Sequence, residues 1–102
     1  MAEGPEAKTT RRIRERLATV DRAWYFKVRG GPMQSVGVPD ILWTCEANGG
    51  RLVGIEVKAG GNTPTKKQEI MMQRMRLAGV AVIVVWSVDE AASGLRKIGV
   101  PL

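Results

Sequence analysis

The chain has 102 residues, of which 44% are hydrophobic and 25% are charged, and these proportions predict one globular domain spanning residues 1–102. Its formal net charge of +6 favours a polyanionic partner such as nucleic acid. The chain has no histidine and a single cysteine, Cys45, which excludes an internal disulfide, histidine-based catalysis and histidine metal ligation. A metal ion would therefore be held by oxygen atoms, as Mg²⁺ or Mn²⁺ is.

Residues 6–20, EAKTTRRIRERLATV, place Ile13, Leu17 and Val20 at helical spacing, which predicts an amphipathic helix. The other faces of this helix are basic and carry Arg11, Arg12, Arg14 and Arg16. These arginines either form a solvated surface or contact phosphate groups.

Residues 23–28, AWYFKV, predict a strand, and the glycines and prolines of RGGPMQSVGVP predict a loop after it. DILWTCE and RLVGIEVKA are apolar segments separated by ANGG. Because Asn-Gly between apolar runs is a strong hairpin signal, we predict an antiparallel hairpin from Asp40 to Lys58.

GGNTPTKKQ precedes a second helix that we expect to end near Ala78. It has two possible starts: Pro64 in the first turn after a Thr63 cap, or a capping box of Thr65 with Gln68. Its predicted core residues are Ile70, Met71, Met75 and Leu77.

The run VAVIVVW is continuously apolar, as in a strand buried on both faces. A strand, a helix and a strand in this order imply a right-handed crossover between parallel strands. Ser87 and Glu90 predict a capping box for a last helix over residues 89–98. The predicted order is α-β-β-β-α-β-α around a mixed central sheet. We also expect four side chains in the core: Trp24, Trp43, Trp86 and Cys45.

The longest apolar run, GVAVIVVW, is too short to cross a bilayer, and the N-terminus lacks the apolar stretch of a signal peptide. We therefore expect no membrane partner and a cytoplasmic location.

Three polar residues of the hairpin are candidates for chemistry. Asp40 begins one strand, and Glu56 and Lys58 point to one face of the other because strand side chains alternate. Two carboxylates that converge repel each other unless a cation lies between them, and a nearby lysine can orient a water or stabilise charge on a phosphate. Metal-assisted phosphodiester hydrolysis needs these groups. The alternative is a solvated strand face.

GVPD, which contains Asp40, and IEVK, which contains Glu56 and Lys58, together resemble the PD-(D/E)XK nuclease superfamily. The chain further resembles the VRR-NUC (virus-type replication-repair nuclease) domain over roughly residues 6–95. The likeness lies in the order of its segments: a helix with Glu6, GVPD, IEVK, a helix with Gln68, AGV and SVDEA. This resemblance implies a restriction-endonuclease-like α/β fold and a Mg²⁺- or Mn²⁺-dependent DNA endonuclease that leaves 5′-phosphate and 3′-hydroxyl ends.

The resemblance also implies roles for the matching residues. Asp40, Glu56 and the backbone carbonyl of Val57 would bind the metal, and Lys58 would position or activate the attacking water. Gln68 would orient the lysine, a water or the substrate phosphate, unless it only caps its helix.

A helix acid would complete the metal shell through a water molecule. Glu6 is the first candidate and Glu15 the second. Tyr25 and Lys27 could face the same site from the strand before the loop, although Lys27 could equally be a general basic surface residue.

The predicted DNA contacts are basic residues around the site: Lys27, Arg29, Arg11, Arg12, Lys66 and Lys67. The loop from Arg29 to Val36 could enter a groove, and the absence of a base-reading motif favours recognition of DNA shape.

Free-standing members of about this size resemble Holliday-junction resolvases, and the compact free-standing form fits a phage or prophage origin. This likeness implies branched DNA as the substrate and a homodimer, because symmetric cleavage of a four-way junction needs two sites. The alternatives are a non-catalytic nucleic-acid-binding module that retains the nuclease fold and an interaction protein that binds an acidic partner.

Overall fold

The structure is a computed structural model that describes residues 3–29 and 36–102. Most of the loop predicted to enter a DNA groove, residues 30–35, lies outside the described residues. The elements are, in order, α1 (Pro5–Leu17), β1 (Ala23–Lys27), β2 (Ile41–Cys45), the 3₁₀ turn η1 (Glu46–Asn48), β3 (Val53–Val57), α2 (Lys66–Leu77), β4 (Ala81–Val85) and α3 (Val88–Lys97). The predicted order of helices and strands is confirmed.

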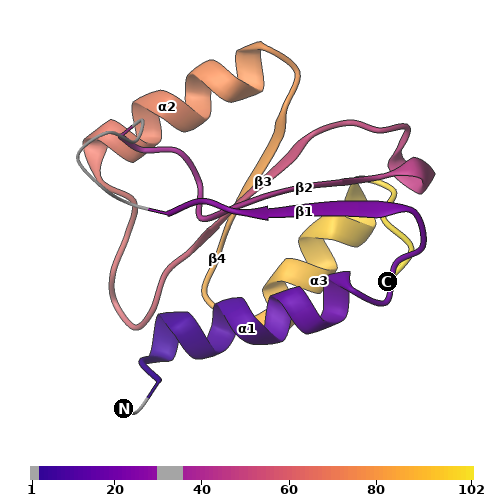
Figure 1. The fold of residues 1–102 in the computed structure, drawn as a ribbon. Helices are drawn as coiled ribbons and strands as arrows, with labels where there is room; N and C mark the ends of the chain where they lie inside the picture. The colour runs from indigo at the N-terminus through magenta and orange to yellow at the C-terminus, as the bar shows by residue number, and fades with distance from the viewer. Residues whose placement is uncertain (1–2, 30–35) are drawn as a thin grey trace.

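The four strands form one mixed sheet in the order β1-β2-β3-β4. The β1–β2 and β2–β3 pairs are antiparallel, and the β3–β4 pair is parallel. Helices α1 and α3 cover one face of the sheet, whereas α2 lies on the other (Figure 1). The α2 crossover between β3 and β4 therefore gives the sheet helices on both faces.

The predicted hairpin joins β2 to β3, with Ile41 opposite Ile55 and Trp43 opposite Val53. Its connection is longer than a two-residue turn, because η1 follows β2 directly. Gly49 and Gly50 then have φ angles of +76° and +74°, a left-handed conformation that glycine adopts without strain.

The main core lies between the sheet and α1 with α3. Ile13 and Leu17 of α1 are buried against it, as the helical spacing predicts, and Trp43 and Cys45 of β2 are buried as expected. All five residues of β3 are buried, since this central strand lies beneath helices on both of its faces (Figure 1).

The predicted core face of α2 is wrong in part. Met72 is the buried residue of this helix, while Ile70 and Leu77 are 52% and 82% exposed. At 100° per residue, Gln68, Met72 and Met75 lie on one side of the helix, and Ile70 and Leu77 lie on the other. The helix therefore places Gln68, rather than Ile70, over the sheet.

The expected burial of Trp24 and Trp86 is also wrong. Trp24 is 52% exposed and stacks on Phe26, which is 51% exposed, with ring centroids 5.9 Å apart. Both belong to β1, an edge strand. Trp86 is 36% exposed, and its indole Nε1 donates a hydrogen bond to the carbonyl of Asn62.

The helix starts resolve the two capping alternatives. Thr65 is the N-cap of α2 and forms the capping box with Gln68, so the Thr63 alternative is wrong. Ser87 caps α3 by accepting a hydrogen bond from the Glu90 backbone N–H. Across the described residues, no helix combines the length and apolar character needed to span a membrane.

Candidate active site

Asp40 is fixed at the start of β2 by contacts with both neighbouring strands. The Val28 N–H donates to the Asp40 carbonyl at 2.8 Å. The Asp40 carboxylate oxygen Oδ2 accepts a hydrogen bond of 2.8 Å from the Val57 N–H. This second bond holds the carboxylate beside the residue that follows Glu56, so the two acids approach each other as the hairpin predicts.

Glu56 is a charged side chain in a buried position, with 2% exposure. Its oxygen Oε2 lies 3.5 Å from the Lys58 ammonium and 3.2 Å from the Gln68 amide nitrogen. Its other oxygen, Oε1, is buried and has no hydrogen-bond partner among the described residues. Burial and then the nearby Asp40 raise the pKa of Glu56 to about 7, although Lys58 opposes this shift.

Gln68 connects the start of α2 to the acidic pair. Its Oε1 accepts from the Thr65 N–H at 2.9 Å, while its Nε2 donates to Glu56. The helix-cap interpretation of Gln68 is therefore confirmed, and its role in the site stays a prediction. The side chain contacts the carboxylate of Glu56 in this structure.

A divalent cation fits the chemistry of this donor set. A buried carboxylate oxygen without a partner is unfavourable, and so is the proximity of two carboxylates. A hard cation that takes oxygen ligands would relieve both. Asp40, Glu56 and the Val57 carbonyl are the residues that could hold it.

The helix acids do not add a third close carboxylate. Within residues 3–29 and 36–102, no three acidic or cysteine side chains group closely enough to hold a metal ion. Glu6 nevertheless lines the same cavity as Asp40. Glu15 instead pairs with Arg11 at 2.9 Å and lines a separate hollow. Of the two candidates, Glu6 is therefore the one beside the site, and its contact through water stays a prediction.

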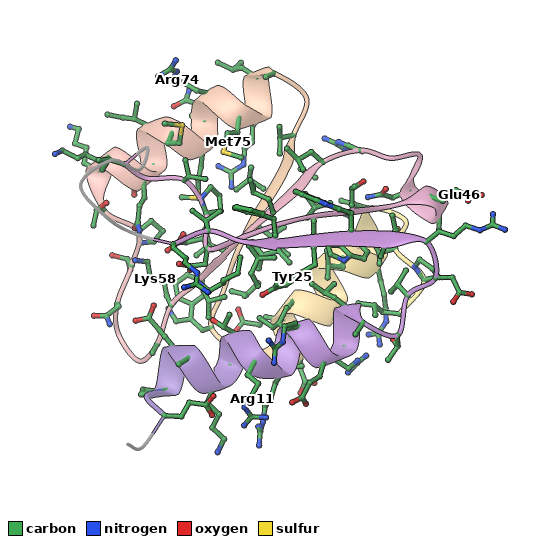
Figure 2. The ribbon with its side chains drawn as sticks, viewed as in Figure 1. Arg11, Tyr25, Glu46, Lys58, Arg74 and Met75 are labelled. Carbon is green, nitrogen blue, oxygen red and sulfur yellow. The ribbon has the colours of Figure 1, made fainter. Side chains whose placement is uncertain are left out.

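The cavity beside Asp40 has a volume of about 540 Å³ and lies between α1 and β1. Tyr25 and Lys27 line it, as proposed from the sequence, and Tyr25 lies on the α1 side of the sheet (Figure 2). Burial raises the pKa of Tyr25; Arg14 opposes this shift and Asp40 adds to it.

The predicted DNA contacts fall into three places. Arg11, Lys27 and Arg29 line the cavity of Asp40. Arg12 lies at the other hollow, with Trp86 and Ser87. Lys66 and Lys67 are exposed at the start of α2. The structure therefore gathers only part of this set around the candidate site.

Arg14 is one of the four helix arginines that could contact phosphate, but the sequence did not place it beside Asp40, where it lines the cavity. The spacing of residues along the predicted helix could have placed Arg14 beside the site. Glu6, Thr10 and Arg14 recur every four residues and line the same cavity, so they form one stripe on the surface of α1.

The four-stranded mixed sheet with helices on both of its faces is a small α/β fold. A solved structure described as "VRR_NUC domain" has this fold and matches with a TM-score of 0.74, covering 91% of this chain and 95% of that chain at 23% sequence identity. No protein-family model matches the sequence, and no curated protein matches it. The chain has the fold of a VRR-NUC domain, which confirms the restriction-endonuclease-like architecture.

Proposed function

We propose that the protein is a metal-dependent endodeoxyribonuclease that hydrolyses phosphodiester bonds with Mg²⁺ or Mn²⁺. The observation that carries this proposal is the Glu56 carboxylate, which is buried beside Asp40 with one oxygen unpartnered among the described residues. Asp40, Glu56 and the Val57 carbonyl would hold the cation. The likeness to the VRR_NUC domain structure supports a nuclease-type domain.

Each residue of the cluster has a distinct task in this proposal. Bound Mg²⁺ would polarise the phosphoryl group and lower the pKa of a water molecule. Lys58, whose ammonium lies 3.5 Å from Glu56, positions that water or stabilises charge on the phosphate. Gln68 keeps Glu56 oriented through its amide nitrogen. Hydrolysis of the P–O3′ bond leaves a 5′-phosphate and a 3′-hydroxyl.

The proposed substrate is branched DNA, and the proposed active form is a homodimer, because paired cleavage of a four-way junction needs two sites related by symmetry. The stacked Trp24 and Phe26 side chains support a second copy of the chain, since each remains about half exposed. Large aromatic side chains with this exposure are common at protein interfaces.

The test is a cleavage assay on labelled four-way junction, flap and linear duplex DNA, in Mg²⁺, Mn²⁺ or EDTA. We expect cleavage of the branched substrates in either metal and none in EDTA. Lys58→Met should abolish cleavage and retain binding. Cleavage that persists in EDTA or in Lys58→Met would refute the assigned site. Binding by the wild type without cleavage in either metal would favour a non-catalytic binding module.

A further inference from the structure

The cavity beside Asp40 has the features of a site for an anion. Four cationic side chains line it from α1, β1 and the segment that follows β1: Arg11, Arg14, Lys27 and Arg29. Its volume of about 540 Å³ falls within the range of small-molecule binding sites. It can therefore accept a nucleotide-sized group rather than water alone.

Arg11 also lines this cavity, but its guanidinium is already engaged. It pairs with Glu3 at 3.0 Å and with Glu15 at 2.9 Å, and these hydrogen bonds raise its pKa. Arg14, one helical turn further along α1, forms no ion pair within the described part of the chain. Of the two α1 arginines that line the cavity, Arg14 is therefore the one whose charge can pair with a bound anion.

Tyr25 provides a neutral donor next to this charge. Burial raises the pKa of its hydroxyl, so the group stays protonated at neutral pH and can donate a hydrogen bond. The guanidinium of Arg14 comes from α1 and the hydroxyl of Tyr25 from β1, and both side chains line the same cavity. These two donors suit the non-bridging oxygens of a phosphodiester, because arginine binds such oxygens through charge-assisted hydrogen bonds.

The acids of the cavity indicate which phosphate of the DNA strand Arg14 and Tyr25 would bind. Three acids line the same space, and Glu3 is paired with Arg11. Asp40 and Glu6 would repel an anion unless a cation neutralises them. Asp40 also belongs to the proposed metal site, where the cleaved phosphate would bind. The phosphate that reaches Arg14 and Tyr25 is therefore a neighbour of the cleaved one.

We propose that this cavity binds the backbone phosphate adjacent to the cleaved phosphate on the same DNA strand, through direct contacts with Arg14 and Tyr25. This inference rests on the proposed nuclease function and deepens it. The site reads no base, so it sets the register of the strand against the metal site without selecting sequence.

The experiment combines a protein change with a matched DNA change. Wild-type products first give the cleaved position, and substrates are then made with one neutral methylphosphonate linkage at each flanking position. In the wild type, one flanking methylphosphonate should lower kcat/KM about ten- to hundredfold, the range expected for losing a charge-assisted hydrogen bond. Arg14→Ala should lower kcat/KM similarly on normal DNA and should abolish the sensitivity to that linkage.

The control is Arg74→Ala, an exposed arginine on α2, which Figure 2 shows on the outer side of that helix, away from α1. It should cleave normally and keep the sensitivity to the neutral linkage. Tyr25→Phe should lower kcat/KM several-fold, and less than Arg14→Ala. The inference is overturned if Arg14→Ala behaves as Arg74→Ala does, or if it retains the full methylphosphonate effect.

Failure of the nuclease proposal can be told apart from failure of this one. If the wild type cleaves no DNA, the same proteins are compared by fluorescence anisotropy binding to the same DNA in Mg²⁺. A log–log salt slope lower by about 1 in Arg14→Ala than in Arg74→Ala would support the phosphate contact. Equal slopes and affinities would refute it.

Discussion

The amide nitrogen of Gln68 lies 3.2 Å from the Glu56 carboxylate, while the oxygen of the same amide accepts a hydrogen bond from the Thr65 backbone. One side chain thus closes the first turn of α2 and holds the buried acid of the candidate site. The placement of α2 and the orientation of Glu56 are consequently coupled.

Substitutions of Gln68 and Thr65 should separate the two tasks of Gln68, which are to cap α2 and to hold Glu56. The Thr65 variant is the control, because it disturbs only the cap. Thr65→Ala removes the cap hydroxyl and should lower the free energy of unfolding by about 1 kcal/mol, with metal binding retained. Gln68→Ala should destabilise the protein comparably and also weaken Mn²⁺ binding, because Glu56 loses its amide partner. Urea unfolding and Mn²⁺ titration calorimetry measure the two effects. Equal Mn²⁺ affinity in the two variants would contradict the coupling.

Glu56 should make the metal-free protein less stable as the pH rises. Its pKa is raised to about 7 in the folded state, above its unfolded value, so the folded state binds the proton more tightly. The resulting stabilisation is complete below the unfolded pKa and is lost as the pH rises through about 7. The loss reaches at most about 3 kcal/mol.

Urea unfolding in EDTA at several pH values between 4 and 8 checks this dependence. Glu56→Gln removes the titration and should show a correspondingly flatter profile. A wild-type profile that matches Glu56→Gln would contradict the role of Glu56.

Two substitutions of Asp40 should differ in stability and agree in metal binding. Asp40→Asn keeps an oxygen that can accept from the Val57 N–H, the donor that Asp40 now satisfies at 2.8 Å, so it should fold with nearly wild-type stability. Asp40→Ala leaves that N–H without its acceptor and should destabilise the protein by about 1–3 kcal/mol. Both should lose the rise in melting temperature that Mg²⁺ gives the wild type. A normal Mg²⁺ shift in Asp40→Asn would rule out Asp40 as a metal ligand.

A side chain at Gly54 should be destabilising, because a Cβ there would lie 3.0 Å from Pro39 Cγ and 3.4 Å from the Met75 methyl group. Gly54→Ala should lower the free energy of unfolding by about 1–3 kcal/mol. It should also reduce cleavage, since Pro39 directly precedes Asp40. Gly61, where a Cβ would meet nothing within 4 Å, is the control, and Gly61→Ala should change neither quantity. Normal stability of Gly54→Ala would contradict close packing of Pro39 and Met75 against Gly54.

The stacked pair on β1 predicts the oligomeric state. If a second copy covers Trp24 and Phe26, Phe26→Lys should shift the sedimentation coefficient from dimer to monomer, because it places a charge in an apolar interface. The variant should remain folded, since Phe26 is 51% exposed. Sedimentation velocity and circular dichroism check both expectations. A wild-type monomer would refute the proposed dimer, and a dimeric Phe26→Lys would move the interface elsewhere.

The features that sequence predicted well are those set by local pattern. Alternation along β3 and the Asn-Gly connection are enough to predict that Asp40 lies beside Glu56. The buried face of α2 could not be predicted in this way, because apolar residues occur on several sides of that helix. Its orientation depends on non-local packing, such as the hydrogen bond from Gln68 to Glu56 and the position of the Met75 methyl group over Gly54.

The same distinction applies to the acids and aromatics. Glu6 and Glu15 both occur on α1, and only the position of the helix against the sheet shows that Glu6 faces the cavity. Tryptophan is large and apolar, which predicts burial of Trp24, but β1 lies at the edge of the sheet and leaves this ring exposed.

The alternation of side chains along β1 gives this short edge strand two separate surfaces. Tyr25 and Lys27 line the cavity, whereas Trp24 and Phe26 point to the other side of the sheet. Because Tyr25 pairs with Trp43, a slip of one residue against β2 would exchange the two sets. A single-residue insertion or deletion in β1 would therefore disrupt both surfaces together, which makes the length of this strand intolerant of change even though it lies at an edge.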